Sequence, residues 1–233
     1  MSGFHDAIRG SAHAFFVTGT DTGVGKTRVS AALLHALRAR GLRASGMKPV
    51  ASGCTWADGG WRNEDALALL AASDPAPAYA DANPYALPAA TAPQLAAREA
   101  GVSVEPGPLL SAFARIAAAA DAVVVEGVGG WAAPLADGLD QADLVRALGA
   151  QVVLVVGLRL GCLSHSRLTA RAIEADGCPL AGWIGNRVDP DFDRCDDYAG
   201  LLRDALPVPC LGMLPYDPRG DVREAARLLS LPG

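Results

Sequence analysis

The hydrophobic positions of the chain form two kinds of segment that alternate along it. Short apolar runs with few polar interruptions are typical of strands that are buried on both faces of a sheet. We predict such strands at 14–17, 42–50, 122–125, 151–156, 180–184 and 210–213. The intervening segments repeat apolar residues every three or four positions, as amphipathic helices do. We predict helices at 26–40, 64–72, 93–100, 106–120, 141–148, 164–175, 197–205 and 222–229.

This alternation predicts an α/β fold with a mostly parallel sheet and helices on both faces. Residues 51–62 are rich in turn-forming residues, and residues 73–93, rich in proline and alanine, are predicted to be irregular. Asn63 is suited to cap the helix that follows it, and Gly41 suits the end of the first helix. We expect a single domain over 1–233, with 1–13 as a loose tail. In such folds ligands bind beyond the carboxyl ends of the strands.

The most informative segment, Phe15 to Thr27, has the sequence Phe-Phe-Val-Thr-Gly-Thr-Asp-Thr-Gly-Val-Gly-Lys-Thr. A predicted strand leads into a glycine-rich loop, and Lys26-Thr27 open a predicted helix, which is the context of a phosphate-binding loop (P-loop). The backbone N–H groups of such a loop surround phosphate oxygens, its lysine reaches the β- and γ-phosphates, and its threonine can bind Mg²⁺. The alternative is an ordinary strand-to-helix turn, which this context disfavours.

The spacing of this loop departs from the common pattern. Five residues separate Gly19 from Gly25, and Thr20 stands where the strict pattern has glycine. The longer spacing indicates a particular subfamily and disfavours the GTPases. Some partitioning-type ATPases carry a second lysine five residues before the first, and this chain has Asp21 there.

Polar residues also stand at the carboxyl ends of other predicted strands, among them Glu126, Lys48 and Asn186. A carboxylate at the end of a buried strand is costly unless it is paired or binds a metal ion, and in P-loop enzymes such an acid commonly completes the Mg²⁺ shell. A second cation near the γ-phosphate, from Lys48, would stabilise transferring charge. The plainer alternatives are a turn-capping Glu126, a solvated Lys48, and Asp65 as an acid in the first turn of a helix. These residues indicate a Mg-dependent ATP enzyme and leave the acceptor open.

Composition narrows the classes of function. Hydrophobic residues make up 51% and charged residues 19%, which is ordinary for a soluble globular protein. A net charge of −5 without a basic tract disfavours nucleic-acid binding, and the apolar stretches are too short to span a membrane. The five cysteines form no Cys-x-x-Cys pair and the four histidines form no cluster. We therefore expect no disulfide framework or zinc site, and a cytoplasmic location.

Four sequence blocks recur together in one known family. They are Val-Thr-Gly-Thr-Asp-Thr-Gly-Val-Gly-Lys-Thr at 17–27, Lys-Pro-Val-Ala-Ser-Gly at 48–53, Val-Glu-Gly-Val-Gly-Gly-Trp at 125–131 and Gly-Cys-Leu-Ser-His at 161–165. Weaker blocks lie at 62–67, 181–186 and 211–215. In this order and spacing, from about residue 15 to residue 215, the chain resembles the dethiobiotin synthetases, ATP-dependent carboxylases that act late in biotin synthesis.

The resemblance implies a specific reaction of 7,8-diaminononanoate (diaminopelargonate) with CO₂, supplied by bicarbonate, and ATP. One amine forms a carbamate, whose oxygen attacks the γ-phosphate. The second amine then closes a cyclic urea and expels phosphate, giving dethiobiotin, ADP and phosphate. The resemblance also implies Mg²⁺ as cofactor and a homodimer with the substrate site at its interface.

Carried over by position, the resemblance implies roles for individual residues. Catalytic roles fall to Lys26, Lys48 and Thr22, and Mg²⁺ is implied to bind Thr27, Asp65 and Glu126. The diamine and its carboxylate tail are implied to contact Ser52, Gly161, Cys162, Ser164 and Tyr198. Asn186 is implied to contact adenine. The whole ATP site is implied to comprise Gly23, Val24, Gly25, Lys26, Thr27, Arg28, Asp65, Glu126, Gly127, Val128, Gly129, Asn186, Arg187, Pro215, Tyr216 and Asp217.

Two positions depart from the family pattern, and three other classes stay open. Some members carry an acid at Gly23, and some carry asparagine at Ser164. A partitioning or nitrogenase-iron-protein-like ATPase would need the lysine that Asp21 replaces. A catalytically dead regulatory module would have lost a loop or Mg²⁺ residue, and none is lost. A related ATP-dependent amide-forming enzyme is the nearest enzymatic alternative.

Overall fold

A six-stranded sheet forms the centre of the molecule. The structure, a computed structural model, describes residues 12–231. The strands lie in the order β12-β11-β10-β1-β7-β2, and all neighbours pair in parallel. Their bounds are β1 His13–Gly19, β2 Ala44–Met47, β7 Ala122–Glu126, β10 Gln151–Leu158, β11 Leu180–Arg187 and β12 Cys210–Leu214. The mostly parallel α/β sheet predicted from the sequence is thus confirmed.

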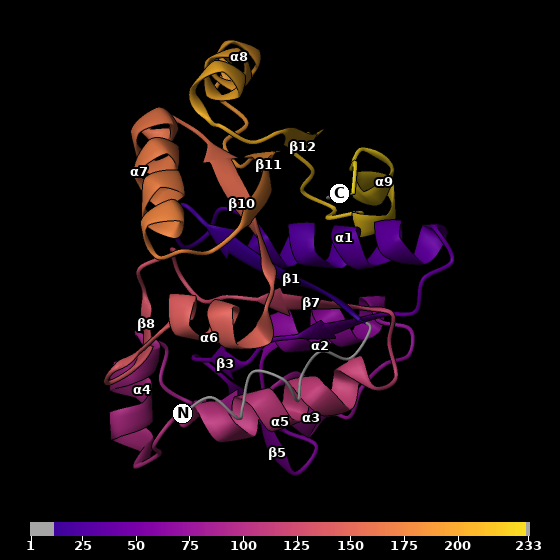
Figure 1. Cartoon of the computed structure of the whole chain (residues 1–233), viewed down its shortest axis with the longest axis vertical. Coiled ribbons are helices and arrows are strands. Elements are labelled where there is room, and N and C mark those ends of the chain that lie inside the picture. The colour runs from indigo at the N-terminus through magenta and orange to yellow at the C-terminus, as the bar shows by residue number, and fades with distance from the viewer. Residues whose placement is uncertain (1–11, 232–233) are drawn as a thin grey trace.

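Helices cover both faces of this sheet (Figure 1). Phe15 and Val17 of β1 pack into the core beneath α1, α2 and α9, whereas Phe16 faces the opposite core, which α5 and α6 cover. Farther along that second face, Leu154 and Trp183 pack with α7 and α8. No helix within residues 12–231 is long and apolar enough to cross a membrane. The helices are α1 Lys26–Ala39, α2 Glu64–Ala72, α3 Tyr79–Ala82, α4 Pro93–Ala100, α5 Pro106–Ala117, α6 Gln141–Leu148, α7 Cys162–Ala175, α8 Cys195–Ala205 and α9 Val222–Arg227.

The strand predicted at 42–50 is wrong at both ends. β2 covers only Ala44–Met47, and Val50–Ala51 form a separate strand, β3, which pairs with β6, Tyr85–Ala86, outside the main sheet. Pro49 explains the break, because proline has no N–H group for a central ladder. The backbone therefore leaves the sheet at Lys48, whose N–H donates to the carbonyl of Ala82.

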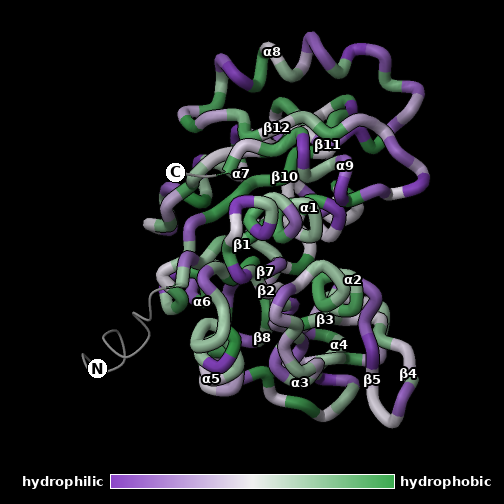
Figure 2. The backbone as a smooth tube through the Cα atoms, turned by 90° about the vertical axis from the view of Figure 1, so that its right-hand side faces the viewer, coloured by the Kyte–Doolittle hydropathy of each residue, from purple (hydrophilic) through white to green (hydrophobic). Residues whose placement is uncertain are grey.

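Several short elements were not predicted. Residues 51–62 contain a hairpin of β4, Thr55–Ala57, and β5, Gly60–Arg62. Asp58 and Gly59 join these strands with φ values of 49° and 73°, as a two-residue hairpin turn of the primed type requires. The segment 73–93 contains α3 and β6, and a further hairpin joins β8, Pro134–Ala136, to β9, Leu139–Asp140. In Figure 2 the β4–β5 hairpin projects beside α3, and Arg62 of β5 lies over the ring of Tyr79 in α3.

The N-terminal tail predicted at 1–13 extends too far. His13 begins β1 and pairs with Ala122, and its N–H donates to the carbonyl of Asp121. Residues 1–11 lie outside the described residues. The predicted N-cap is confirmed, since the Asn63 side chain accepts hydrogen bonds from the N–H groups of Asp65 and Ala66 at the start of α2.

Candidate active site

The P-loop joins the carboxyl end of β1 to α1. Gly25 has φ 90°, and a Cβ atom there would lie 2.1 Å from Nδ2 of Asn186. Glycine is therefore required at this position both for its conformation and for space. Within residues 12–231, no side chain caps the N-terminus of α1. Its first N–H groups are left for an anion such as phosphate, which the helix dipole also favours.

A cavity of about 760 Å³ lies at this end of the sheet. The loops after β1, β2 and β7 and the start of α2 supply its polar wall, while the segment before α4 and the residues before β8 close its other side. This agrees with ligand binding beyond the carboxyl ends of parallel strands. The lining residues are Thr22, Gly23, Gly25, Lys26, Thr27, Lys48, Ala51, Ser52, Asn63, Asp65, Ala90, Thr91, Ala92, Pro93, Glu126, Val128, Gly129, Ala133 and Pro134.

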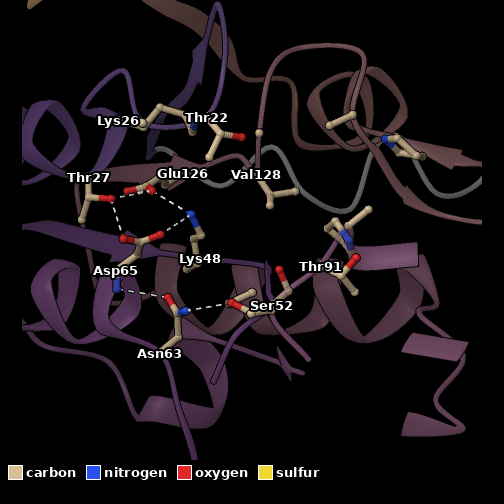
Figure 3. A pocket seen from close by; sticks show the side chains of 18 of the residues that line it. Thr22, Lys26, Thr27, Lys48, Ser52, Asn63, Asp65, Thr91, Glu126 and Val128 are labelled. Carbon is tan, nitrogen blue, oxygen red and sulfur yellow. Dashed lines mark hydrogen bonds and ion pairs between the residues drawn. The ribbon is translucent and has the colours of Figure 1, made fainter. Parts of the chain in front are cut away.

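Lys48 is the centre of a charge cluster in which Lys48 and Glu126 are buried and Asp65 is partly exposed (Figure 3). Its side chain is 4% exposed, and Nζ lies 2.7 Å from Oε1 of Glu126 and 2.9 Å from Oδ2 of Asp65. Burial lowers the pKa of Lys48, but the two carboxylates outweigh this effect and raise it above its usual value. Burial likewise raises the pKa of Asp65, but Lys48 and a hydrogen bond from Thr27 bring it below its usual value. Lys48 and Asp65 are therefore both ionised at neutral pH.

The hydroxyl of Thr27 lies between the same two carboxylates. Its Oγ1 is 2.7 Å from Oδ1 of Asp65 and 3.0 Å from Oε1 of Glu126. Among the described residues, the other oxygen of Glu126, Oε2, is buried without a hydrogen-bond partner. A buried carboxylate oxygen without a partner is costly and marks a position for a ligand.

These three side chains fit Mg²⁺. They offer only oxygen ligands, which Mg²⁺ prefers, and Oε2 of Glu126 has a free lone pair for it. No group of three or more His, Cys, Asp and Glu side chains that could hold a metal ion occurs in residues 12–231. A cation at Thr27, Asp65 and Glu126 would therefore complete its shell with phosphate oxygens and water, as Mg²⁺ usually does in nucleotide enzymes.

Lys26, the first residue of α1, is also buried. Its Nζ donates to the carbonyl of Asp21 at 3.0 Å. Burial, followed by repulsion from Lys48, lowers its pKa to about 8. Glu126, Asp65 and Asp21 only partly offset these two effects, and the negative charge of an incoming phosphate would stabilise the ammonium group further.

A second group of predicted residues lies across α1 from this cluster. Asn186 is buried near the end of β11, and its Nδ2 donates to the carbonyl of Val24 at 3.0 Å. β11 continues to Arg187, beyond its predicted end, and Arg187 forms an ion pair with Asp196 of α8. Pro215, Tyr216 and Asp217 follow β12 and, together with Arg28, line a separate cavity of about 170 Å³.

The four residues predicted to hold the substrate tail lie elsewhere. None of Gly161, Cys162, Ser164 and Tyr198 lines the 760 Å³ cavity. Gly161 precedes α7, Cys162 is buried, and Ser164 is exposed to solvent. Tyr198 packs edge-on against Phe192, with ring centroids 4.9 Å apart. Ser52 is the one predicted substrate residue that the described cavity includes.

The apolar side of the cavity and one buried glutamine could not be predicted from sequence motifs. Thr91 and its neighbours before α4 carry no recognised motif, and only the fold brings them opposite Ser52. Gln141 is fully buried, and its Nε2 donates to the carbonyls of Val128, Gly130 and Trp131 at 2.7–3.1 Å. It thereby fixes the loop after β7. A polar residue at the start of a predicted helix was the only signal for it.

Solved structures with a similar fold include nucleotide-binding proteins. The septum site-determining protein MinD from Pyrococcus horikoshii, complexed with Mg-ADP, matches with a TM-score of 0.55 and 18% identity over 91% of this chain and 86% of that chain. The signal recognition particle receptor FtsY from Elizabethkingia anophelis, in complex with GDP, matches with a TM-score of 0.52 and 14% identity, covering 95% of this chain and 60% of that chain. At these identities the likeness shows the fold alone.

Sequence comparisons show the family. The family model described as an AAA domain matches residues 13–222. The ATP-dependent dethiobiotin synthetase of Xanthomonas euvesicatoria pv. vesicatoria (strain 85-10) is 62% identical over 94% of this chain and 98% of its own length. That of Xylella fastidiosa (strain 9a5c) is 64% identical over 90% of this chain and 93% of its own length. With such identity over nearly its full length, the chain belongs to the family of ATP-dependent dethiobiotin synthetases.

Proposed function

We propose that the protein carboxylates 7,8-diaminononanoate with CO₂ and closes the ring at the expense of ATP, yielding dethiobiotin, ADP and phosphate. The observation that carries this proposal is the cluster of Lys48, Asp65, Glu126 and Thr27 beside the P-loop, in which Lys48 and Glu126 are buried, in one cavity with Ser52. The cluster provides for phosphate and for a cation, and the cavity leaves room for an organic acceptor.

The P-loop side of the cavity holds the triphosphate. Free N–H groups at the start of α1 bind phosphate oxygens, and the Lys26 ammonium, next to the γ-phosphate, stabilises the charge that develops during transfer. Thr22 lies in the same loop and lines the cavity. Its hydroxyl group donates a hydrogen bond to the reacting oxygens. Mg²⁺, when bound, neutralises the β- and γ-phosphate oxygens. Thr27, Asp65 and Glu126 are the residues that would hold it.

The other side of the cavity holds the diamine. An amine of the substrate, once unprotonated, attacks CO₂, forms the new N–C bond and loses a proton, giving a carbamate anion. The Lys48 ammonium lies between the metal-binding carboxylates and the Ser52 side of the cavity (Figure 3). We infer that it favours the anionic carbamate and repels a protonated amine, while Ser52 hydrogen-bonds the carbamate end.

The carbamate oxygen then attacks the γ-phosphorus, and ADP leaves. The second amine attacks the carbonyl carbon of the mixed anhydride, and phosphate leaves as the cyclic urea forms. Gln141 contributes by holding the loop of Val128 and Gly129, which line the cavity, in one conformation. We infer that this loop positions the reacting groups and excludes water from the anhydride.

We further propose a homodimer in which Gly161–Ser164 of one subunit bind the carboxylate tail of the substrate held by the other subunit. Two exposed leucines beside this segment, Leu160 (79%) and Leu168 (60%), support a contact there with a second copy. We propose a reducing compartment, the cytoplasm, as the place of action. The five free cysteines in the described part of the chain support this.

The experiment that tests the function is direct. The purified protein is incubated with diaminononanoate, ¹³C-bicarbonate and MgATP, and dethiobiotin is followed by mass. We expect a product one mass unit heavier than with ordinary bicarbonate, formed in equal amount with ADP, and none without the diamine. ATP hydrolysis that does not depend on the diamine, with no product, would instead favour a partitioning-type ATPase.

A further inference from the structure

The nucleotide base has one side of the P-loop available to it. Glu126 and Lys48 lie at the ends of β7 and β2, on one side of β1 in the sheet, and Asp65 at the start of α2 contacts Lys48 there. A metal ion held by Thr27, Asp65 and Glu126 would neutralise the charge of the γ-phosphate, so we expect the γ-phosphate to lie toward that side. The base therefore extends toward β11 and β12, where Asn186 packs against Gly25 of the loop.

Arg28 crosses this side of the site from the first turn of α1. Its Nη1 donates to Oδ1 of Asn186 at 3.1 Å and to the carbonyl of Pro215 at 2.8 Å. Its Nη2 lies 3.7 Å from the carboxylate of Asp217, and the arginine side chain is only 16% exposed. Arg28 thus joins the three elements that flank the base, namely α1, the end of β11 and the segment after β12.

One donor of Arg28 is left over. Within residues 12–231, Nε of Arg28 is buried and has no hydrogen-bond partner. A buried guanidinium donor without an acceptor is costly, so a ligand that brings an acceptor to it is favoured.

The amide of Asn186 has a fixed orientation. Its Nδ2 donates to the carbonyl of Val24 while Oδ1 accepts from Arg28. A flipped amide would place its NH₂ group against the guanidinium and its oxygen against a carbonyl. The polar groups at this side of the P-loop are therefore two carbonyl oxygens that already accept from Arg28, and the buried Nε–H group of Arg28, which has no acceptor within residues 12–231.

We propose that Arg28 sets the base specificity of this enzyme and makes it tolerant of nucleotides with a keto group on the base edge. The exocyclic amine of adenine must compete with Nη1 of Arg28 for Oδ1 of Asn186 and the carbonyl of Pro215. A keto oxygen, such as O6 of hypoxanthine or guanine, instead receives a hydrogen bond from the guanidinium. This inference rests on the proposed function for the position of the triphosphate.

Inosine triphosphate is the sharpest probe, because it keeps the purine frame of ATP and differs on one edge of the base, where a keto oxygen replaces the amine and N1 carries a hydrogen. We expect the wild type to use ITP with a kcat/KM within about tenfold of that for ATP. Arg28→Met keeps an unbranched apolar stem of similar length to the aliphatic part of arginine and removes the guanidinium donors. It should lower kcat/KM for ITP relative to ATP by about tenfold or more, because a charged hydrogen bond to the keto oxygen is lost.

A matched control lies in the same segment. Arg219 is 82% exposed and lies 3.7 Å from the carboxylate of Asp217. Arg219→Met removes the same charge from this segment without changing the contacts of Asn186 or Pro215. The ratio of kcat/KM for ITP to kcat/KM for ATP should therefore stay as in the wild type. Competition of ATP and ITP against a fluorescent ADP analogue measures the same preference without the reaction.

The outcomes are distinct. A loss of about tenfold or more in kcat/KM for ITP relative to ATP in Arg28→Met, but not in Arg219→Met, supports the role of Arg28. A smaller change, an equal loss of both nucleotides, or a wild type that uses ITP more than about tenfold worse than ATP overturns it. The last result needs no variant, so the inference can be rejected even if Arg28→Met does not fold. A wild type that makes no dethiobiotin from ATP refutes the proposed function, and the competition measurement still decides the base preference.

Discussion

Two helices of this protein begin in nearly the same way. α1 follows β1 and α7 follows β10, and these two strands are neighbours in the sheet. Gly25 and Gly161 precede the helices with φ values of 90° and 93°. In the described residues neither helix has a side-chain cap, so both leave N–H groups available to an anion.

Their surroundings differ. The start of α1 faces the 760 Å³ cavity and the buried charges of Lys26, Lys48 and Glu126. The start of α7 lies outside that cavity, next to Leu160, which is 79% exposed. A helix N-terminus thus becomes a site only when other elements add charge and enclosure. The α1 site obtains both from β2, β7 and α2 of the same chain, whereas the α7 site would need a second copy to supply them.

The largest effect should follow removal of the charge at the α1 site. Lys26→Ala should lower kcat by about 10³-fold, the order found when a donor to a transition-state oxyanion is lost. The fold should change little, because the Lys26 ammonium contacts only the carbonyl of Asp21 among the described residues. Single-turnover kinetics and thermal melts measure both. Turnover within tenfold of wild type in a folded variant would contradict the role of Lys26.

A smaller loss should follow a change in the metal-binding set. Glu126→Gln keeps the shape of the side chain and removes its charge, so it should weaken apparent Mg²⁺ affinity about tenfold and lower kcat. The Mg²⁺ dependence of turnover and calorimetry of Mg-ADP binding give the two readouts. Glu174→Gln, the same change at an exposed position of α7, is the control. If the Mg²⁺ titration of Glu126→Gln matches that of the wild type, Glu126 has only a structural role.

The α7 site is tested by mixing variants. Ser164→Asp places a charge next to the proposed tail carboxylate, and an acid in the first turn is compatible with the helix. When the Ser164→Asp and Lys26→Ala proteins exchange subunits, about half of the dimers contain one subunit of each variant. In such a dimer one site carries both substitutions and the other site carries neither. Activity should therefore recover to about a quarter of the wild-type value. Recovery close to zero, with subunit exchange verified by mass, would mean that each site lies within one subunit.

The smallest effect compares the two glycines directly. Gly161→Ala imposes only backbone strain, because the nearest atom to the new Cβ would be Cε1 of His165 at 3.7 Å. We expect about 1–2 kcal/mol of destabilisation. Gly25→Ala adds a clash at 2.1 Å with Asn186 and should cost about 1–3 kcal/mol more, since the buried amide loses its hydrogen bond to Val24. Equal shifts of melting temperature in the two variants would show that Asn186 moves away freely.

The amino-acid sequence by itself determined the parallel α/β fold, the P-loop and the carboxyl-end positions of Lys48 and Glu126. These features depend on local properties, namely hydrophobic period, glycine spacing and the ends of apolar runs, so a single sequence carries them. It also determined the family, because the blocks from 17 to 215 recur in fixed order. Pro49 is also present in the sequence, but the strand was predicted to continue through it to residue 50, whereas β2 ends at Met47.

Only the tertiary structure decided which of these residues act together. Lys48 and Asp65 are adjacent because α2 packs beside β2. The contacts of Lys48 with Glu126 at 2.7 Å and with Asp65 at 2.9 Å contradict the alternative that Lys48 is a solvated lysine. The bridge of Arg28 to Asn186 and Pro215 spans three elements that are far apart in the chain. Such contacts depend on how helices and strands pack, and hydrophobic period does not encode which polar side chains meet at the end of a sheet.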